Sequence, residues 1–106
     1  MTKTIEDRIL ARIIDDAIAA GLVISLNDGE ETTVECSSNP EEITTAAKST
    51  DEDILSFYKM GEFLGKVGWV HLIWGNDQDL ISDSSVSHGI DALIDPIMKD
   101  INDDKI

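Results

Sequence analysis

The chain has 106 residues, and its 22 acidic side chains against 8 basic ones give a formal net charge of -14 at pH 7. This charge excludes unaided electrostatic binding to DNA, RNA or an anionic membrane, because like charges repel. It leaves two interpretations open, namely solubility alone and attraction to a basic partner. The hydrophobic content of 42% suffices for a single core, so we expect one domain over residues 1–106.

Cys36 is the only cysteine, so an intrachain disulfide is impossible. We expect its side chain to be a small buried hydrophobe, since no His, Lys or Arg lies near it in sequence to activate the thiol. The first twelve residues contain no apolar run preceded by positive charge. We therefore expect no signal peptide and a cytoplasmic location.

An amphipathic helix is predicted over residues 4–20. Apolar residues recur at helical spacing from Ile5 to Ile18. Thr4 and Asp7 resemble a capping box at its start. Gly21 can adopt the left-handed conformation in which many helices end.

A β-hairpin is predicted to follow the helix. Residues 22–26 alternate as a strand does, and residues 32–36 return as a second strand. The inward-facing residues of the second strand are expected to be Thr32, Val34 and Cys36. Because Asp28-Gly29 tolerates positive φ angles, we expect a tight turn at residues 27–30.

A short helix is predicted over residues 39–48, where an asparagine can cap the helix and Pro40 suits its first position. The segment from residue 50 to residue 60 fits either a helix or a strand. We favour the strand, because Phe57 and Tyr58 are good β formers.

The stretch Phe63–Gly75 contains both tryptophans and is predicted to be the central strand of the sheet. One face would carry Phe63, Val67, Trp69, His71 and Ile73, and the other Leu64, Lys66, Val70, Leu72 and Trp74. Both faces are largely apolar, which is typical of a strand covered on both sides. We favour one long helix on each face, with Trp69 fully packed in the core. In the alternative, both helices cover one face and leave the other to a second copy or a partner.

A short edge strand is predicted at residues 80–83, followed by a C-terminal helix with an apolar stripe from Val86 to Ile101 and a kink or restart at Asp95-Pro96. The fold class is therefore expected to be α+β. It would comprise a mainly antiparallel sheet of about five strands, two long helices and one short helix, in the order α-β-β-α-β-β-β-α.

Four segments together resemble a group of small acidic phage and prophage proteins of unknown function. They are the DGEE hairpin at 28–31, the STDED turn at 49–53, the VGWV strand at 67–70 and the GND…ISD segment at 75–83. The resemblance covers most of the chain, from about Ile9 to Ile97, and departs at residues 84–87. It implies expression in the cytoplasm of a bacterial host, and it supplies no catalytic residues.

Three candidates for chemistry are weak. Asp77, Asp79 and Asp83 form an oxygen-rich cluster, but their spacing does not match an EF-hand loop, so we predict a turn and no metal. No partner for His71 or for His88 as a general base is evident in sequence. We therefore predict no catalytic residues, no cofactor and no enzymatic activity, with a metal-dependent enzyme as the least favoured alternative.

The predicted function is that of a non-catalytic interaction protein whose acidic surface binds a basic host or toxin protein, as an inhibitor, an anti-defence protein or an immunity protein does. The alternative is a homodimeric structural or adaptor protein that is acidic only for solubility. Asp15, Asp16, Glu30 and Glu31 are candidate surface acids. The best candidate surface is the last helix, with Asp91, Asp95, Asp100, Asp103 and Asp104.

Overall fold

The computed structural model describes residues 4–48, 50–59, 65–85 and 88–106, which form three α-helices, five strands and one 3-10 helix. The helices are α1 (Ile5–Ala19), α2 (Pro40–Ala46) and α3 (His88–Asn102). The strands are β1 (Leu22–Asn27), β2 (Thr32–Ser37), β3 (Glu52–Lys59), β4 (Gly65–Ile73) and β5 (Ile81–Ser84), with the 3-10 helix η1 (Asp77–Asp79) before β5. The predicted α+β class and the order of elements are confirmed.

The sheet has the order β2-β1-β3-β4-β5, and every neighbouring pair is antiparallel. The strand predicted within residues 50–60 is confirmed as β3, and β3 is also the central strand. The prediction that Phe63–Gly75 would be central is therefore wrong. Within that stretch Gly65–Ile73 forms β4, next to the edge strand β5, and Trp74 and Gly75 lie in the turn after it, while Phe63 and Leu64 lie outside the described residues. The difference arises because the β1–β2 hairpin pairs with the free edge of β3.

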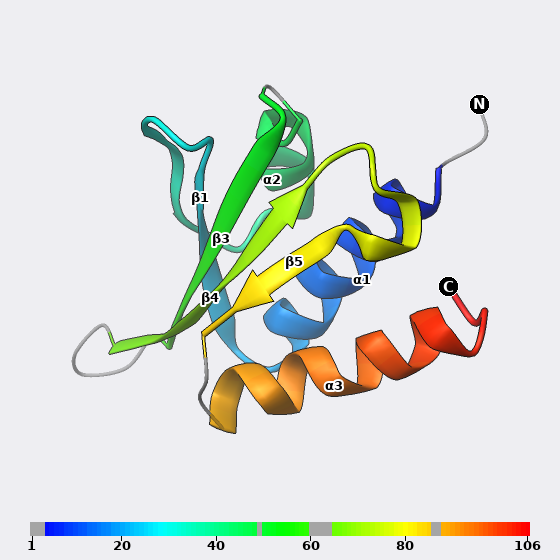
Figure 1. The fold of residues 1–106 in the computed structure, drawn as a ribbon. Coiled ribbons are helices and arrows are strands. Elements are labelled where there is room, and N and C mark those ends of the chain that lie inside the picture. The colour runs from blue at the N-terminus through cyan, green and yellow to red at the C-terminus, as the bar shows by residue number, and fades with distance from the viewer. Residues whose placement is uncertain (1–3, 49, 60–64, 86–87) are drawn as a thin grey trace.

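Both long helices pack on the same face of the sheet, where α1 contacts β1, α3 contacts β4, and the two helices contact each other (Figure 1). The favoured prediction of one helix on each face is thus wrong, and the placement of both helices on one face, as in its alternative, is confirmed. That a second copy or a partner covers the other face stays a prediction. The core lies between this face and the helices. Its sheet residues include Leu22, Ile24, Leu26, Val34, Leu55, Phe57, Val70 and Leu72, and its helix residues include Ile9, Ile13, Ile14, Ile43, Ile90, Ile94 and Ile97.

The helix ends follow the signals in the sequence. Thr4 and Asp7 form the predicted capping box, in which the Asp7 N–H donates to Thr4 Oγ1 at 3.1 Å and the Thr4 N–H donates to Asp7 Oδ2 at 3.3 Å. Gly21 follows α1 with a φ of +82°. At the start of α2, the Asn39 Oδ1 accepts the Glu41 N–H at 3.0 Å, which satisfies an N–H that the helix leaves free.

The turn between β1 and β2 spans residues 28–31, one residue later than predicted. Gly29 has a φ of +100°, and the Asp28 Oδ1 accepts the N–H groups of Glu30 and Glu31 at 2.9 Å each. These two bonds hold the pKa of Asp28 below its usual value. A turn of the same length, closed by the Asp28 side chain and displaced by one residue, thus replaces the predicted turn of residues 27–30.

α3 continues as one helix through Pro96, so the predicted restart does not occur. Proline removes the N–H that would bond to the carbonyl four residues earlier, which here belongs to Ala92. Both Pro96 and Ala92 are exposed. Water can therefore bond to this carbonyl, so the loss of one helical hydrogen bond does not end the helix.

Both edges of the sheet are irregular. The pairing of β1 with β2 shifts register between Ile24 and Leu26 and again between Leu26 and Asn27, and the pairing of β4 with β5 shifts between His71 and Leu72. Bulges and short strands prevent an edge from adding a further strand from another chain. The sheet edges are therefore poor docking sites.

A pair of truncations tests this layering. Phe57 is fully buried between sheet and helices, whereas Trp69 is half-buried on the opposite face. We expect Phe57→Ala to lower the free energy of unfolding by about 3–5 kcal/mol, as is usual for a packed core aromatic, and Trp69→Ala to lower it by less than half of that. Urea unfolding of both variants is the measurement. Equal losses would show that the Trp69 face is covered in solution.

Candidate functional site

The sheet face opposite the helices is the main candidate site, and we name it the open face. In the described part of the chain no helix packs on it. It consists of alternate strand residues that face away from the core, namely Val23, Ser25, Asn27, Glu35, Glu52, Ile54, Ser56, Tyr58, Lys66, Trp69, His71, Ile73 and Asp83. Five of these side chains are aliphatic or aromatic, and all five are half-buried, namely Val23, Ile54, Tyr58, Trp69 and Ile73.

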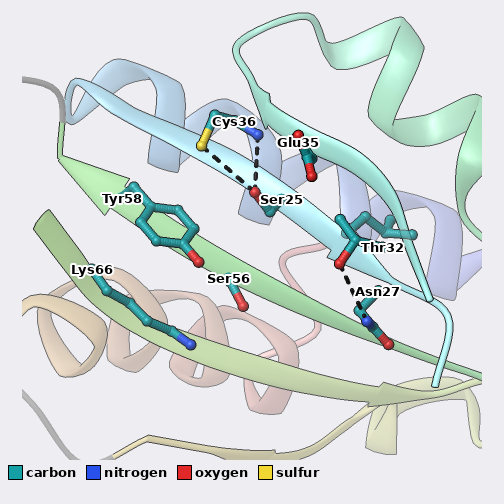
Figure 2. A pocket seen from close by; sticks show the side chains of 9 residues that line it. Ser25, Asn27, Thr32, Glu35, Cys36, Ser56, Tyr58 and Lys66 are labelled. Carbon is teal, nitrogen blue, oxygen red and sulfur yellow. Dashed lines mark hydrogen bonds between the residues drawn. The ribbon is translucent and has the colours of Figure 1, made fainter. Parts of the chain in front are cut away.

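A shallow cavity of about 390 Å³ lies on the open face over β1, β2, β3 and β4 (Figure 2). Its lining is mixed, about equally polar and apolar, and includes Ser25, Glu35, Ser56, Tyr58 and Lys66. A cavity of this size could accept a side chain of a docked partner, but the lining lacks the largely apolar character of most small-molecule pockets.

Cys36 also lines this cavity, where it is exposed. The prediction that it would be buried is wrong. The register shifts between β1 and β2 place Val34 opposite Leu26 and Ser37 opposite Ile24, so the chain contains an extra residue between them. Cys36 takes a φ of +44°, and its N–H donates to the Ser25 Oγ at 2.9 Å on the open face. Of the three predicted inward residues, only Val34 is buried.

His71 lies on β4 between Trp69 and Ile73, and each of its ring nitrogens has an oxygen within hydrogen-bond distance. Its Nε2 is 2.9 Å from Glu52 Oε2, and its Nδ1 is 3.1 Å from Ser82 Oγ. Sequence reasoning missed these partners because they lie on neighbouring strands. The β3–β4 pairing and the shift in β5 bring them to His71.

These three side chains resemble a Ser-His-acid triad in composition, but the arrangement does not favour catalysis. Ser82 is exposed on the edge strand, and its hydroxyl also lies 3.3 Å from the His71 carbonyl oxygen, to which it can donate instead.

A second polar cluster fixes one end of the sheet to the helices. Asp53 is fully buried, and its Oδ2 accepts the Trp74 Nε1–H at 2.7 Å and the Lys48 N–H at 2.9 Å. The Asp53 Oδ1 has no hydrogen-bond partner among the described residues. Burial raises the pKa of Asp53, although its two hydrogen bonds oppose the shift. The cluster is structural, because it ties the loop before β3 to the end of β4.

The neighbouring contacts have the same role. The Lys48 Nζ lies 2.6 Å from Asp7 Oδ1 and 4.9 Å from the centre of the Trp74 ring. This bond to Lys48 holds the pKa of Asp7 below its usual value. The buried carboxylate of Glu6 accepts the N–H groups of Gly75 and Asn76 at 2.8 and 3.1 Å, which anchors the turn after β4 to α1.

The five acids predicted as a surface on the last helix do not form one free surface. Asp100 lies 2.6 Å from Arg12 Nη1, which links α3 to α1, and Arg12 also binds Asp16 at 2.7 Å. The Asp104 Oδ1 is 3.4 Å from Gln78 Nε2. The members of the set that are exposed without such a bond in the described structure are Asp91, Asp95 and Asp103.

The candidate metal cluster is divided between two elements. Asp77 and Asp79 belong to η1, whereas Asp83 lies on β5 opposite His71. Among the described residues, no three His, Cys, Asp or Glu side chains gather in a way that could hold a metal ion. The absence of a metal stays a prediction, and we expect calorimetric titration with Ca²⁺, Mg²⁺ and Mn²⁺ to detect no tight site that Asp79→Asn removes.

Comparison with protein-family models, with curated proteins and with solved structures finds no significant match for the chain. Within the described residues, no helix has both the length and the apolar character needed to cross a membrane.

The buried carboxyl group of Asp53 predicts a specific dependence of stability on pH. An acid whose pKa is raised in the folded chain stabilises the fold fully below its unfolded pKa, here 3.8, and loses this contribution as the pH rises through the folded value. We therefore expect the unfolding free energy of the parent, taken relative to Asp53→Asn, to fall as the pH rises above about 4. Chemical unfolding of both proteins at a series of pH values measures the difference. A difference that is constant or rises with pH would contradict the assignment.

Proposed function

We propose that this protein is a non-catalytic protein-binding domain that docks a basic partner protein onto its open face. The observation that carries the proposal is the asymmetry of the layers. Both long helices cover one face of the sheet, and on the opposite face Ile54, Tyr58 and Trp69 are half-buried, so that each reaches solvent in part. Exposed apolar patches with polar surroundings are typical of protein interaction sites, and tyrosine and tryptophan are enriched at their centres.

The negative charge around the open face indicates that the partner is basic. In the described part of the chain, only Asp7, Asp16 and Asp100 form ion pairs with a lysine or arginine. The carboxylates around the open face, Glu35, Glu52 and Asp83, outnumber its one lysine, Lys66. An apolar centre with an acidic rim is complementary to an apolar surface with a basic rim, and the net charge of -14 would speed the association.

A second copy of the chain fits the same apolar face less well. Each protomer would bring the same net charge of -14, so that the two rims would repel each other. The bulged edges also disfavour docking by strand addition, in a homodimer or with another partner. Face-to-face binding of a basic protein is therefore the favoured arrangement.

The resemblance to small phage and prophage proteins extends this proposal. It would make the partner a host protein or a toxin in the bacterial cytoplasm, and the function that of an inhibitor, an anti-defence protein or an immunity protein. A basic groove that normally holds nucleic acid is a suitable target, since carboxylates can substitute for phosphates there.

A pair of variants separates the open face from the last helix. Trp69→Lys places a positive charge at the apolar centre of the open face, and the matched control Asp91→Asn/Asp95→Asn/Asp103→Asn removes three charges, two from α3 and one from the residue just after it. We expect the parent and the α3 variant to capture the same basic protein from a lysate of the source cells, and Trp69→Lys to lose at least about tenfold in affinity for it.

Circular dichroism should first show that both variants are folded. Retention of the basic protein by Trp69→Lys, with loss by the α3 variant, would move the site to α3 and overturn the proposal. Light scattering on the parent and on Trp69→Lys measures the oligomeric state and tests the remaining alternative, a homodimer. A dimeric parent that becomes monomeric in Trp69→Lys would make a second copy the occupant of the open face.

A further inference from the structure

Resting on the proposed function, we infer that His71 is a charge switch on the open face, beside the carboxylates of Glu52 and Asp83, which weakens the binding of a basic partner when the ring gains a proton. The position of the residue is the first support. The His71 side chain is 25% exposed between Trp69 and Ile73, so a partner docked on this face would cover it.

The second support is that the same neighbours can bond to the ring in both of its protonation states. In the neutral state, an Nε2–H donates to Glu52 Oε2 at 2.9 Å, and the Ser82 hydroxyl donates to Nδ1 at 3.1 Å. In the protonated state, Nδ1 carries a proton and donates to Ser82 Oγ. The Ser82 hydroxyl can then turn to the His71 carbonyl oxygen, which is 3.3 Å away.

A rotation of one hydroxyl hydrogen therefore accommodates the added proton without movement of heavy atoms. Histidine is also the side-chain type that changes charge between about pH 5 and pH 8. The arrangement keeps the shape of the open face constant while its charge changes by one.

The charged groups that face His71 determine the sign of the effect. They are Glu52 from β3 and Asp83, which pairs with His71 from β5, while Ile54 opposite it on β3 is apolar. Protonation of the ring neutralises one of these two negative charges. The basic rim of a partner would then be attracted less, and the buried imidazolium would also lose its hydration.

The test uses a short amphipathic peptide of leucine and lysine as a defined basic probe. We expect its dissociation constant for the parent to rise about fivefold or more between about pH 7.5 and pH 5.5, since one unit charge at an interface changes affinity by this order. His71→Gln should remove most of the change. His88→Gln, which alters the other histidine at the start of α3, is the matched control and should retain it.

The tautomer gives a second readout that needs no partner. Nitrogen NMR of the imidazole should show the Nε2–H form of His71 at about pH 7.5 and progressive protonation of Nδ1 on acidification. An Nδ1–H neutral form, or an equal loss of affinity in His71→Gln and the parent, would overturn the switch and leave the proposed function standing. A peptide that binds at neither pH would overturn both, because the open face would then not recognise basic, apolar surfaces.

Discussion

The close approach of α3 to β4 is the constraint on which the rest of the structure depends. Gly68 on β4 faces Ile90 of α3, and a Cβ on this glycine would collide with the Ile90 side chain and with Ser85. From the helix side, a Cβ on Gly89 would collide with the Val67 side chain. One position without a side chain on each element thus lets the helix lie against this strand. With α1 already packed on β1, both long helices occupy one face, and no helix of the described chain covers the other.

Because of this asymmetry, the carboxylates fall into two groups, those that stabilise the fold and those that can bind a partner. On the helix side, Glu6 and Asp53 bind backbone N–H groups, and Asp100 joins the two long helices through Arg12. These acids hold the fold together and are not free to bind a partner. The carboxylates around the open face and on the exposed side of α3 form no ion pair with a lysine or arginine of the described chain, so they can act on a partner. A formal charge of -14 thus overstates how much of the acidity is available for recognition.

Local signals predicted the elements well, because capping and turn preferences act within a few residues. Thr4, Gly21 and Asn39 each mark a helix end where the sequence indicates one. The order of the strands and the choice of face depend on pairings between distant residues, which periodicity cannot supply. The partners of His71, for example, are 19 and 11 residues away in sequence, and the exposure of Cys36 follows from a bulge with no clear sequence mark. The fold class was therefore predictable, whereas the candidate site was not.

The apolar pattern of β4 led to the wrong prediction that a helix covers each face of the sheet. The cause of this error also bears on function. A face with Trp69 and Ile73 is typical of a strand covered on both sides, and within the described chain the covering layer is missing. Acidic residues chosen for solubility alone would be expected together with a polar open face, since exposed aromatic side chains favour aggregation. An aromatic face retained within a highly charged protein is better explained if a partner covers it. The charge then keeps the free protein in solution and, for a basic partner, also brings the two surfaces together.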